Sequence, residues 1–344
     1  MISISDKINS ILVTGGSGFI GSALVRKLLK ETNIKVFNLD KLGYSSHLNI
    51  FDPEINSNQY QLINIDLFDA NETKKAIKLI NPDLVFHLAA ESHVDKSITA
   101  PKKFLESNVI GTFNLLDALL IHWESLSESR KSHFRILHVS TDEVFGSIDN
   151  DVLFSEETRY DPRSPYSATK AASDHLVRSW NNTYGLPSII TYSCNNFGPW
   201  QFPEKLIPVI IGNCLSNKSI PIYGDGKYVR DWIYVEDHID ALIQVILKGK
   251  IGESYCIGAR QLKTNVEVVR IICDFLDVYK KENAPHIKLI KYIKDRPGHD
   301  RRYAIDNKKI SKELQWTTKY NFNEAIDLTV RWYLDHPEWL HQSI

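Results

Sequence analysis

The sequence predicts an α/β fold: a doubly wound parallel sheet followed by a smaller C-terminal domain of mixed helices and strands. Three observations lead to this prediction. From Ile11 to about Asn196, short apolar segments alternate with amphipathic segments of helical periodicity. The glycine-rich stretch TGGSGFIG lies between the first apolar segment and the first helical one. No internal repeat or low-complexity tract interrupts the alternation.

The first elements follow directly from these patterns. ILVTGG is expected to form the first strand, and Ile20, Leu24 and Leu28 of FIGSALVRKLLKE fall on one face of a helix. KVFNLD and QLINIDL are expected as the next two strands. Asn71 is expected to cap the following helix, which runs to Ile80 and precedes the strand DLVFHLAA.

The alternation continues with a long helix over 104–122, the strand RILHVSTDEVF, a helix over 166–184 and the strand SIITYS. Repeated strand-helix units imply parallel strands whose sheet is covered by helices on both faces. We therefore expect this sheet to form one domain, residues 1–193.

Residues 194–344 are expected to form the second, substrate-binding domain, although a segment near 230–260 is expected to return to the first. NFGPWQFPEKLIP breaks the alternation and is expected either to lie over an active site or to pack a domain junction. Two helices carry start patterns, because Thr264 with Glu267 and Asn321 with Glu324 have the spacing of capping boxes.

Composition narrows the possible partners. The chain has 344 residues and a formal net charge of −1, so it lacks the basic field that favours nucleic acid. The cysteines at 194, 214, 256 and 273 form no Cys-x-x-Cys pair, and we expect buried thiols rather than a metal site or disulfides. No uninterrupted apolar run reaches about 18 residues, and the N-terminus lacks the apolar core of a secretory peptide. A cytoplasmic protein without a membrane partner is expected.

The stretch TGGSGFIG is typical of a Rossmann-type dinucleotide site. Gly15, Gly18 and Gly21 would let the backbone turn tightly and approach a pyrophosphate at a helix N-terminus. Asp40 ends the second strand, where a carboxylate accepts hydrogen bonds from ribose hydroxyls and repels a 2′-phosphate, which favours NAD over NADP. The alternative is that Asp40 only caps a loop, and the adjacent Lys41 would offset part of its charge.

Tyr166 and Lys170 in PYSATK have the i, i+4 spacing that places two side chains on one helix face. An ammonium near a phenol stabilises the phenolate, so we expect Lys170 to lower the pKa of Tyr166 and make it a usable base. Lys170 would also hold a nicotinamide ribose. The alternative, a solvated helix face, applies to most pairs with this spacing.

The strand RILHVSTDEVF ends in Ser140, Thr141, Asp142 and Glu143. Ligands of open α/β sheets bind beyond the carboxyl ends of the strands. There, one carboxylic acid can protonate a leaving hydroxyl while its neighbour removes a carbon-bound proton. The alternative is a strand-end Asp that caps a turn, followed by an exposed Glu.

With these residues, the chain resembles the family of dTDP-glucose 4,6-dehydratases, extended short-chain dehydrogenases known from bacterial rhamnose pathways. The resemblance covers nearly the whole chain. It is carried by HLAAESHVDKSI, STDEVFG, SPYSATKAASDHLVRSW, NNFGPWQFPEKLIP, IYGDGKYVRDWIYVEDH and DRPGHDRRYAID. The Asp142-Glu143 pair is its most discriminating part, because similar reductases that epimerise or decarboxylate usually carry other residues there.

The resemblance implies conversion of dTDP-glucose to dTDP-4-keto-6-deoxyglucose and water, with NAD regenerated in place. Tyr166 would remove the proton of the sugar 4-hydroxyl as the C4 hydride passes to NAD, and Thr141 would hydrogen-bond the 4-oxygen. Glu143 would take the C5 proton while Asp142 protonates the departing 6-hydroxyl. The hydride then returns to C6.

The resemblance also assigns binding residues. For the cofactor it implies Gly15, Gly18, Phe19, Ile20, Gly21, Asp40, Lys41, Asp66, Leu67, Ala89, Ala90, Ser107, Tyr166, Lys170 and Asn196. For the substrate it implies Ser92, Thr141, Asn195, Lys205, Leu206, Tyr223, Arg230, Asn265, Arg296 and His299. The two arginines suit a diphosphate because a guanidinium fork matches phosphate oxygens. A homodimer is implied too, through the helices around 104–122 and 166–184.

Two positions depart from the family pattern. Phe197 stands where the family usually has Tyr, so one hydroxyl near the cofactor or substrate is expected to be missing. Gly43 stands where Thr is common, which removes one possible contact on the adenosine side. Neither change touches the expected acid, base or Tyr-Lys pair.

Other functions stay open at this point. A UDP-glucose 4,6-dehydratase shares all these motifs, and one thymine methyl group is worth only about 1–3 kcal/mol of discrimination. A 4-epimerase or a UDP-glucuronate decarboxylase would use the Tyr-Lys pair but needs no acid to expel the 6-hydroxyl. A non-catalytic NAD-binding scaffold would be expected to have lost Tyr166, Lys170 or the acidic pair.

Overall fold

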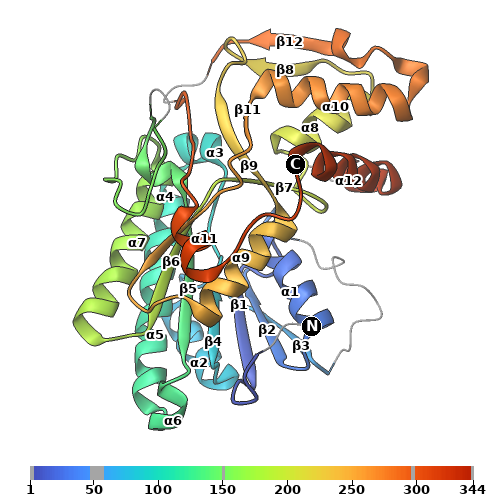
Figure 1. The fold of residues 1–344 in the computed structure, drawn as a ribbon. Coiled ribbons are helices and arrows are strands. Elements are labelled where there is room, and N and C mark those ends of the chain that lie inside the picture. The colour runs from blue at the N-terminus through green and yellow to red at the C-terminus, as the bar shows by residue number, and fades with distance from the viewer. Residues whose placement is uncertain (1–3, 47–57, 149–151, 296–298, 342–344) are drawn as a thin grey trace.

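The computed structural model describes residues 4–46, 58–148, 152–295 and 299–341. Figure 1 shows a large sheet covered by helices, with a smaller lobe above it. The sheet has seven strands in the order β10-β6-β5-β4-β1-β2-β3, and every neighbouring pair is parallel. The strands are β1 (Ser10–Thr14), β2 (Lys35–Asp40), β3 (Tyr60–Asn64), β4 (Leu84–His87), β5 (Arg135–Thr141), β6 (Ser188–Ser193) and β10 (Ser254–Ile257). The predicted fold class is confirmed.

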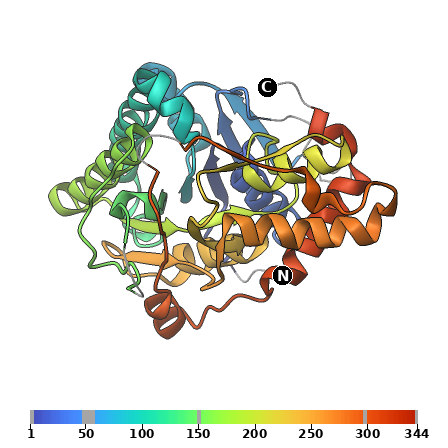
Figure 2. The same ribbon diagram turned by 90° about the horizontal axis from the view of Figure 1, so that it is seen from above.

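Helices cover both faces of the sheet (Figures 1 and 2). One face carries α2 (Ala70–Ile80), α5 (Gly111–Ser125) and α7 (Pro165–Tyr184), which pack side by side. The other carries α1 (Phe19–Glu31), α9 (Val235–Lys248) and α11 (Lys308–Leu314). The strands β1, β5 and β6 are almost wholly buried between these layers, as expected for a parallel sheet.

The smaller lobe contains two short sheets and three longer helices. The first sheet joins β7 (Asn195–Phe197), β9 (Val229–Tyr234) and β11 (Leu262–Thr264), and the second pairs β8 (Ile220–Tyr223) with β12 (Ile290–Ile293). The helices are α8 (Leu206–Leu215), α10 (Asn265–Tyr279) and α12 (Phe322–Asp335).

Two buried apolar clusters lie under these layers. The first fills the sheet domain and includes residues from 233–257, which return to it from the later part of the chain. It also includes Tyr303, Ile305 and Trp316, a second return that the division at residue 194 does not contain. The other cluster fills the smaller lobe and includes Phe197.

The helix expected over 104–122 is longer and less regular than predicted. A short helix α4 (Pro101–Phe104) leads through a π-helical turn at 105–110 into α5. By length and composition, Pro101–Ser125 is apolar enough to cross a membrane, although no uninterrupted apolar run in it reaches about 18 residues. Half of its most apolar stretch is buried inside the protein, where α5 packs on α2 and α7, and core helices of soluble proteins pass the same test.

Helix starts follow the capping rules, with one correction. Thr264 and Asn321 form the two predicted capping boxes with Glu267 and Glu324. The predicted cap of α2 is wrong, because the carboxylate of Asp69, not Asn71, accepts from the backbone amides at the helix start. A carboxylate at this end also interacts favourably with the helix dipole.

Asp69→Ala should therefore lower the free energy of unfolding by about 1 kcal/mol, because two amides of α2 lose their acceptor. Asn71→Ala is the matched control and should change stability by less than about 0.5 kcal/mol. Urea titrations of both variants would measure the difference. Equal losses in the two variants would contradict the assignment of the cap to Asp69.

Candidate active site

A cleft of about 330 Å³ lies at the carboxyl ends of the central strands. Its walls come from the ends of β1, β2, β4, β5 and β6, from the start of α7, and from the loop 201–205 of the smaller lobe. The strand order reverses between β4 and β1, and ligands of open α/β sheets bind outside such a reversal. The volume is within the range of small-molecule sites.

The glycine stretch forms a close turn at one end of the cleft. Gly15 has a positive φ of 71°, and a Cβ on Gly21 would lie 2.1 Å from the carbonyl oxygen of Gly15. A side chain at Gly21 would therefore force the turn apart. No side chain caps α1 after Gly18, so the first amides of this helix remain available to an anion.

Asp40 ends β2 beside this turn, and its carboxylate is held on both oxygens. Oδ2 accepts from the backbone amide of Ser17 (3.0 Å), and Oδ1 accepts from the hydroxyl of Ser46 (3.0 Å). Lys41 does not pair with it, because its ammonium lies 2.7 Å from the carboxylate of Glu91. Lys41 therefore offsets less of the negative charge of Asp40 than the sequence suggests.

The residues expected to bind the cofactor come from several strand ends and from several helices. All of them line the cleft. They are Gly15, Gly18, Phe19, Ile20, Gly21, Asp40, Lys41, Asp66, Leu67, Ala89, Ala90, Ser107, Tyr166, Lys170 and Asn196.

Tyr166 and Lys170 enter the cleft from the first turns of α7, which begins at a capping box formed by Ser164 and Ser167. Lys170 is almost completely buried and donates to the carbonyl oxygen of Val139 (2.9 Å). Burial lowers its pKa to about 8. The ammonium therefore predominates at neutral pH by only a modest margin.

The expectation that the pKa of Tyr166 is lowered is wrong when only the protein's own groups act on it. Burial and the carboxylate of Glu143 raise this pKa, and a hydrogen bond with Thr141 opposes them only in part. The stabilising effect of one ammonium is outweighed, because desolvation disfavours the phenolate and a carboxylate repels it. Tyr166 thus holds its proton firmly until another positive charge enters the cleft.

Asp142 and Glu143 form the first turn of a 3-10 segment (142–145) directly after β5. Thr141 caps this turn, because its hydroxyl accepts from the amide of Glu143 (3.3 Å). Asp142 is 2 % exposed, and its Oδ2 has no hydrogen-bond partner among the residues that the structure describes. Burial and the neighbouring Glu143 raise the pKa of Asp142 well above its usual value. The two adjacent carboxyls are therefore unlike each other, and Asp142 is suited to donate a proton.

Of the expected substrate residues, four line the cleft: Ser92, Thr141, Asn195 and Lys205. Leu206 begins α8 immediately next to Lys205, whose ammonium donates to the carbonyl oxygen of Ser92 (3.2 Å).

A separate group lies in the smaller lobe. The ring of His299 stacks on Tyr228 with 3.7 Å between ring centroids and meets the edge of Tyr223 at 6.2 Å. The amide of Asn265 donates to the carbonyl oxygen of Tyr228 (3.1 Å). Tyr223, Asn265 and His299 therefore belong together, as expected of residues that share a ligand, but they do not line the cleft. Arg296 lies outside the described residues.

Arg230 is placed differently from its expected role. Its guanidinium is buried and donates to the carbonyl oxygens of Val229 and Asp300, both at 2.8 Å, and it lies over the ring of Tyr303. Its charge opposes the increase in the pKa of Asp142. Contact with a phosphate stays a prediction for this residue.

Sequence reasoning missed several side chains that close the cleft. Tyr44 donates to Glu204 (2.9 Å), which also accepts from Lys96 (2.9 Å), and Phe202 packs against Tyr44 edge to face. Glu204 and Phe202 lie in the stretch NFGPWQFPEKLIP, so the expectation of a loop over the site was the available clue. Trp200 of the same stretch packs against Trp332 and Trp339 within the smaller lobe, so the alternative of packing at a domain junction stays a prediction.

Comparison with known proteins identifies the family. The model of the GDP-mannose 4,6 dehydratase family matches residues 12–329. A dTDP-glucose 4,6-dehydratase of Salmonella typhimurium is 49% identical over 96% of this chain and 94% of its own length. One from Neisseria meningitidis is 47% identical over 96% of this chain and 95% of its own length.

The chain belongs to the dTDP-glucose 4,6-dehydratase family.

Solved structures agree with this assignment. DesIV, a dTDP-glucose 4,6-dehydratase of Streptomyces venezuelae crystallised with NAD, matches with a TM-score of 0.88 and 38% identity over 96% of this chain and 98% of its own. A UDP-glucose 4-epimerase of Thermotoga maritima has a similar TM-score of 0.84 at only 26% identity, over 95% of this chain and 99% of its own. The fold alone thus does not separate dehydratases from epimerases, whereas the sequence does. The family resemblance seen in the sequence is confirmed.

The two departures from the family pattern have different meanings in the structure. Phe197 does not line the cleft; its ring packs with Trp232, Tyr234 and Phe322 in the core of the smaller lobe. The expected loss of a hydroxyl near the ligands is therefore wrong, because this side chain points into that core. Gly43 does line the cleft, and a Cβ there would meet only Cε of Lys41 at 3.7 Å. The family's Thr would fit.

Asp142→Asn should stabilise the fold, and increasingly so as pH rises. The unfolded chain releases the Asp142 proton near pH 3.9, whereas the folded protein holds it to a much higher pH. Between these two values the folded state binds more protons, so the natural protein loses stability as pH rises. The amide variant avoids that loss. Denaturant titrations at about pH 4.5 and about pH 7 should show a stability difference that grows with pH; a constant difference would contradict the raised pKa of Asp142.

Proposed function

We propose that this protein is an NAD-dependent dTDP-glucose 4,6-dehydratase, a carbon-oxygen lyase that forms dTDP-4-keto-6-deoxyglucose and water. The observation that carries the proposal is the buried acid Asp142 beside Glu143, opposite the Tyr166-Lys170 pair in one cleft. An epimerase needs the latter pair only. The named relatives and DesIV support the nucleotide and the cofactor.

The residues at the glycine end fit a dinucleotide. The turn at Gly15 and Gly21 leaves no room for side chains, and the uncapped start of α1 offers amides to a pyrophosphate. Asp40 already accepts a hydroxyl hydrogen bond, from Ser46, which is the contact that a ribose would make. NAD held there would supply a hydride acceptor for the sugar C4 and would give the hydride back to C6 as C5 regains a proton.

The first proton transfer belongs to Tyr166. Its phenol accepts the proton of the sugar 4-hydroxyl, and the ammonium of Lys170 stabilises the phenolate. Because burial and Glu143 raise the pKa of Tyr166, this step depends on positive charge at the cleft. Thr141, which is hydrogen-bonded to Tyr166, orients the 4-oxygen.

Water elimination belongs to the acidic pair. Once C4 is a ketone, the C5 proton is acidic because its carbanion is delocalised into the carbonyl, and Glu143 removes this proton. Burial raises the pKa of Asp142 well above its usual value, which favours the protonated acid, and Asp142 protonates the departing 6-hydroxyl. The two neighbouring carboxyls thus act as base and acid in one step.

The nucleoside diphosphate extends toward the smaller lobe in this proposal. Lys205 at the cleft wall supplies positive charge, and the group of Tyr223, Asn265 and His299 supplies ring faces and a polar side chain. We further propose a cytoplasmic location. Its support is that the four cysteines are buried free thiols, which suits a reducing compartment.

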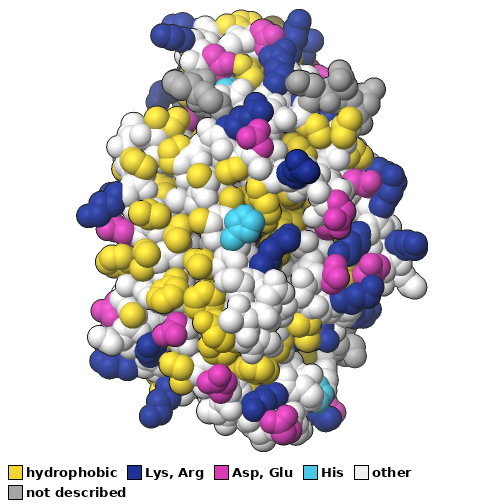
Figure 3. Space-filling view, turned by 90° about the vertical axis from the view of Figure 1, so that its left-hand side faces the viewer, with side chains coloured by type: hydrophobic (Ala, Val, Ile, Leu, Met, Phe, Trp, Pro, Cys, Tyr) yellow, Lys and Arg dark blue, Asp and Glu magenta, His cyan; other side chains and the backbone are white. Residues whose placement is uncertain are grey.

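We also propose a homodimer through the surface formed by α4, α5 and α7. Apolar side chains are exposed along it, and Figure 3 shows hydrophobic patches over this side of the molecule. They are Leu105, Ile110, Phe113, Ile121 and Tyr184, and Ile98 is exposed on the preceding short helix α3 (Val94–Thr99). Phe113 packs edge to face on Trp180, so the surface joins α5 to α7. Burial of such a continuous apolar surface against a second copy removes it from water.

The reaction is tested with purified enzyme and dTDP-glucose, with UDP-glucose and CDP-glucose in parallel. Mass spectrometry should show loss of one water from dTDP-glucose, and a product with the alkali-induced absorbance of a 4-keto-6-deoxy sugar. In D₂O, Asp142→Asn should still exchange the C5 proton while water loss falls about 100-fold or more, since an amide is no acid. Glu143→Gln should lose the exchange as well.

Glu128→Gln is the matched control, because Glu128 is 89% exposed and lies outside the cleft; its turnover should be unchanged. Water loss only from UDP-glucose would keep the mechanism and overturn the choice of nucleotide. Epimerised sugar without water loss would overturn the dehydratase proposal.

Phe113→Lys should weaken the dimer about 30-fold, since a central aromatic residue of an interface contributes about 2 kcal/mol or more. Sedimentation velocity over a dilution series measures the change against a protomer of 39.5 kDa. Val278→Lys is the control, since Val278 is 63% exposed on α10 in the other lobe. A natural protein that sediments as a monomer at every concentration would contradict the dimer.

A further inference from the structure

The helix α7 carries a third ionisable residue on the face of Tyr166 and Lys170. Asp174 follows Lys170 by four residues, as Lys170 follows Tyr166, so the three side chains lie along one helix face. Asp174 is fully buried, behind Lys170 as seen from the cleft, and it does not line the cleft. The proton transfers described above leave it without a role.

The carboxylate of Asp174 is held by side chains of neighbouring elements. Oδ2 accepts from the hydroxyls of Ser140 on β5 (2.8 Å) and Tyr160 (3.2 Å). Oδ1 lies 3.1 Å from Nε2 of His138, also on β5. Every one of these contacts favours the ionised carboxylate, because each offers it a hydrogen-bond donor.

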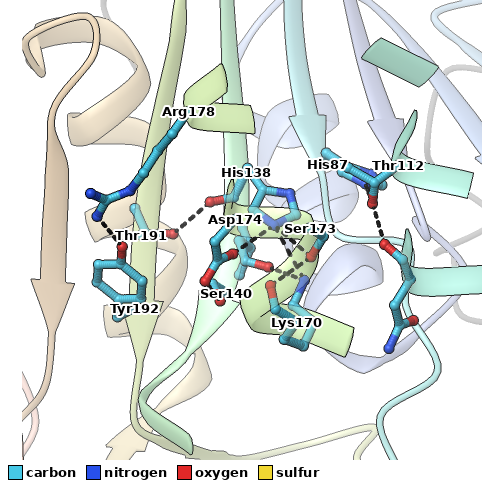
Figure 4. Close-up of polar contacts among 12 residues, drawn as sticks. His87, Thr112, His138, Ser140, Lys170, Ser173, Asp174, Arg178, Thr191 and Tyr192 are labelled. Atoms are coloured by element: carbon cyan, nitrogen blue, oxygen red, sulfur yellow. Dashed lines mark hydrogen bonds and ion pairs between the residues drawn. The ribbon is translucent and has the colours of Figure 1, made fainter. Parts of the chain in front are cut away.

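His138 connects this carboxylate to Lys170. Its Nε2 lies 3.5 Å from Nζ of Lys170, and Figure 4 shows Lys170, His138 and Asp174 gathered with Ser140 and Ser173 between β5 and α7. A proton on Nε2 satisfies the contact with Asp174, and this nitrogen then cannot accept from Lys170, so His138 lies between the two groups without a hydrogen bond to the ammonium. Burial lowers the pKa of His138 well below its usual value, so its imidazole is neutral and the pair of opposite charges is Lys170 with Asp174.

The charges that face Lys170 come from several elements. His87 on β4 and His138 on β5 are both buried, and burial lowers the pKa of each, so neither adds charge near neutral pH. Tyr166 lies one turn earlier on α7, and its own pKa is raised. Asp174 is the group that raises the pKa of Lys170 against the effect of burial.

Side chains on the side of Asp174 away from Lys170 are also linked by hydrogen bonds. Tyr160 shares a hydrogen bond with Tyr192 on β6 (2.8 Å). Arg178, one turn later on α7, donates to Tyr192 (2.7 Å), as Figure 4 shows. Burial raises the pKa of Asp174 to about 6, while the charges of Lys170 and Arg178 oppose that increase. The carboxylate is therefore ionised at neutral pH and takes up a proton below about pH 6.

We propose that Asp174 is a positioning residue, the buried counter-ion that keeps Lys170 an ammonium bound to the carbonyl oxygen of Val139, one helical turn from Tyr166. This inference rests on the proposed function of the Tyr166-Lys170 pair. Lys170 is taken out of water almost completely, and a buried cation without a nearby anion gives up its proton. The site can place no carboxylate on the cleft side of Lys170 without repelling the phenolate, so the anion lies behind it.

Asp174→Asn tests the proposal, because it keeps the shape and removes the charge. Competitive acetylation of Lys170, followed by mass spectrometry, should show its titration falling by about one pH unit from about 8. The alkaline limb of turnover should move with it. Turnover at pH 8 then falls about fivefold, since the charged fraction drops from about one half to about one tenth. Below about pH 6 the two enzymes should converge, because Asp174 of the natural protein is then protonated too.

Two further variants guard against a merely structural explanation. Tyr160→Phe removes one hydrogen bond to Asp174 but no charge, so it should lower stability and leave the alkaline limb in place. Arg178→Gln removes a cation that keeps Asp174 ionised, so the acid limb of turnover should move to higher pH. This variant alters a half-exposed residue and keeps the test available if Asp174→Asn fails to fold.

The proposal is overturned if Asp174→Asn lowers the melting temperature but leaves both the titration of Lys170 and the alkaline limb unchanged. It is also overturned if Arg178→Gln leaves the acid limb in place. The acetylation experiment needs no turnover. A protein that dehydrates no nucleotide sugar would therefore overturn the proposed function without deciding the role of Asp174.

Discussion

Charge buried at the carboxyl end of β5 is the constraint on which the rest of the site depends. In one cleft the protein removes from water an ammonium, Lys170, and a carboxyl, Asp142. Burial shifts the pKa of each group, to about 8 for Lys170 and upward for Asp142. Both shifts favour the neutral form, yet the proposed chemistry needs a charged lysine and a neutral acid. Burial alone therefore suits the acid and works against the lysine, so the lysine needs support from its surroundings.

The parallel sheet makes this arrangement possible. Five strands end at the same edge, so Gly15, Asp40, Ala89, Thr141 and Asn195 meet around one cleft although they are far apart in sequence. The backbone there is fixed by close approach, as the 2.1 Å between a Cβ on Gly21 and the oxygen of Gly15 indicates. A rigid edge of this kind holds polar side chains within hydrogen-bond distance of one another. The loop 201–205 then reaches the same cleft from the smaller lobe.

Much of this was predictable from sequence, for definable reasons. Local patterns determined the strand-helix alternation, the two capping boxes and the face shared by Tyr166 and Lys170, because spacing alone decides them. What depends on distant residues was not predictable. The cap of α2 required knowing where the helix starts, the place of Phe197 required its partners Trp232 and Phe322, and the burial that raises the Tyr166 pKa required the packed cleft. Return of 303–316 to the sheet domain likewise leaves no mark in the local sequence.

Dehydration and oxidation make opposing demands on this one cleft. In the proposed function Glu143 is the base for C5, yet its charge raises the pKa of Tyr166 and so disfavours the phenolate that starts the reaction. An epimerase, lacking the acidic pair, would not meet this conflict. A dehydratase must therefore hold more positive charge near its tyrosine than the shared fold requires. In our proposal that demand is met farther along the same face of α7 and outside the cleft, where a carboxylate can sustain the lysine without adding to the repulsion that Tyr166 already experiences. Because Asp174 lies two turns beyond Tyr166 on the same helix, the distance between base and counter-ion is fixed by helical geometry rather than by a loop.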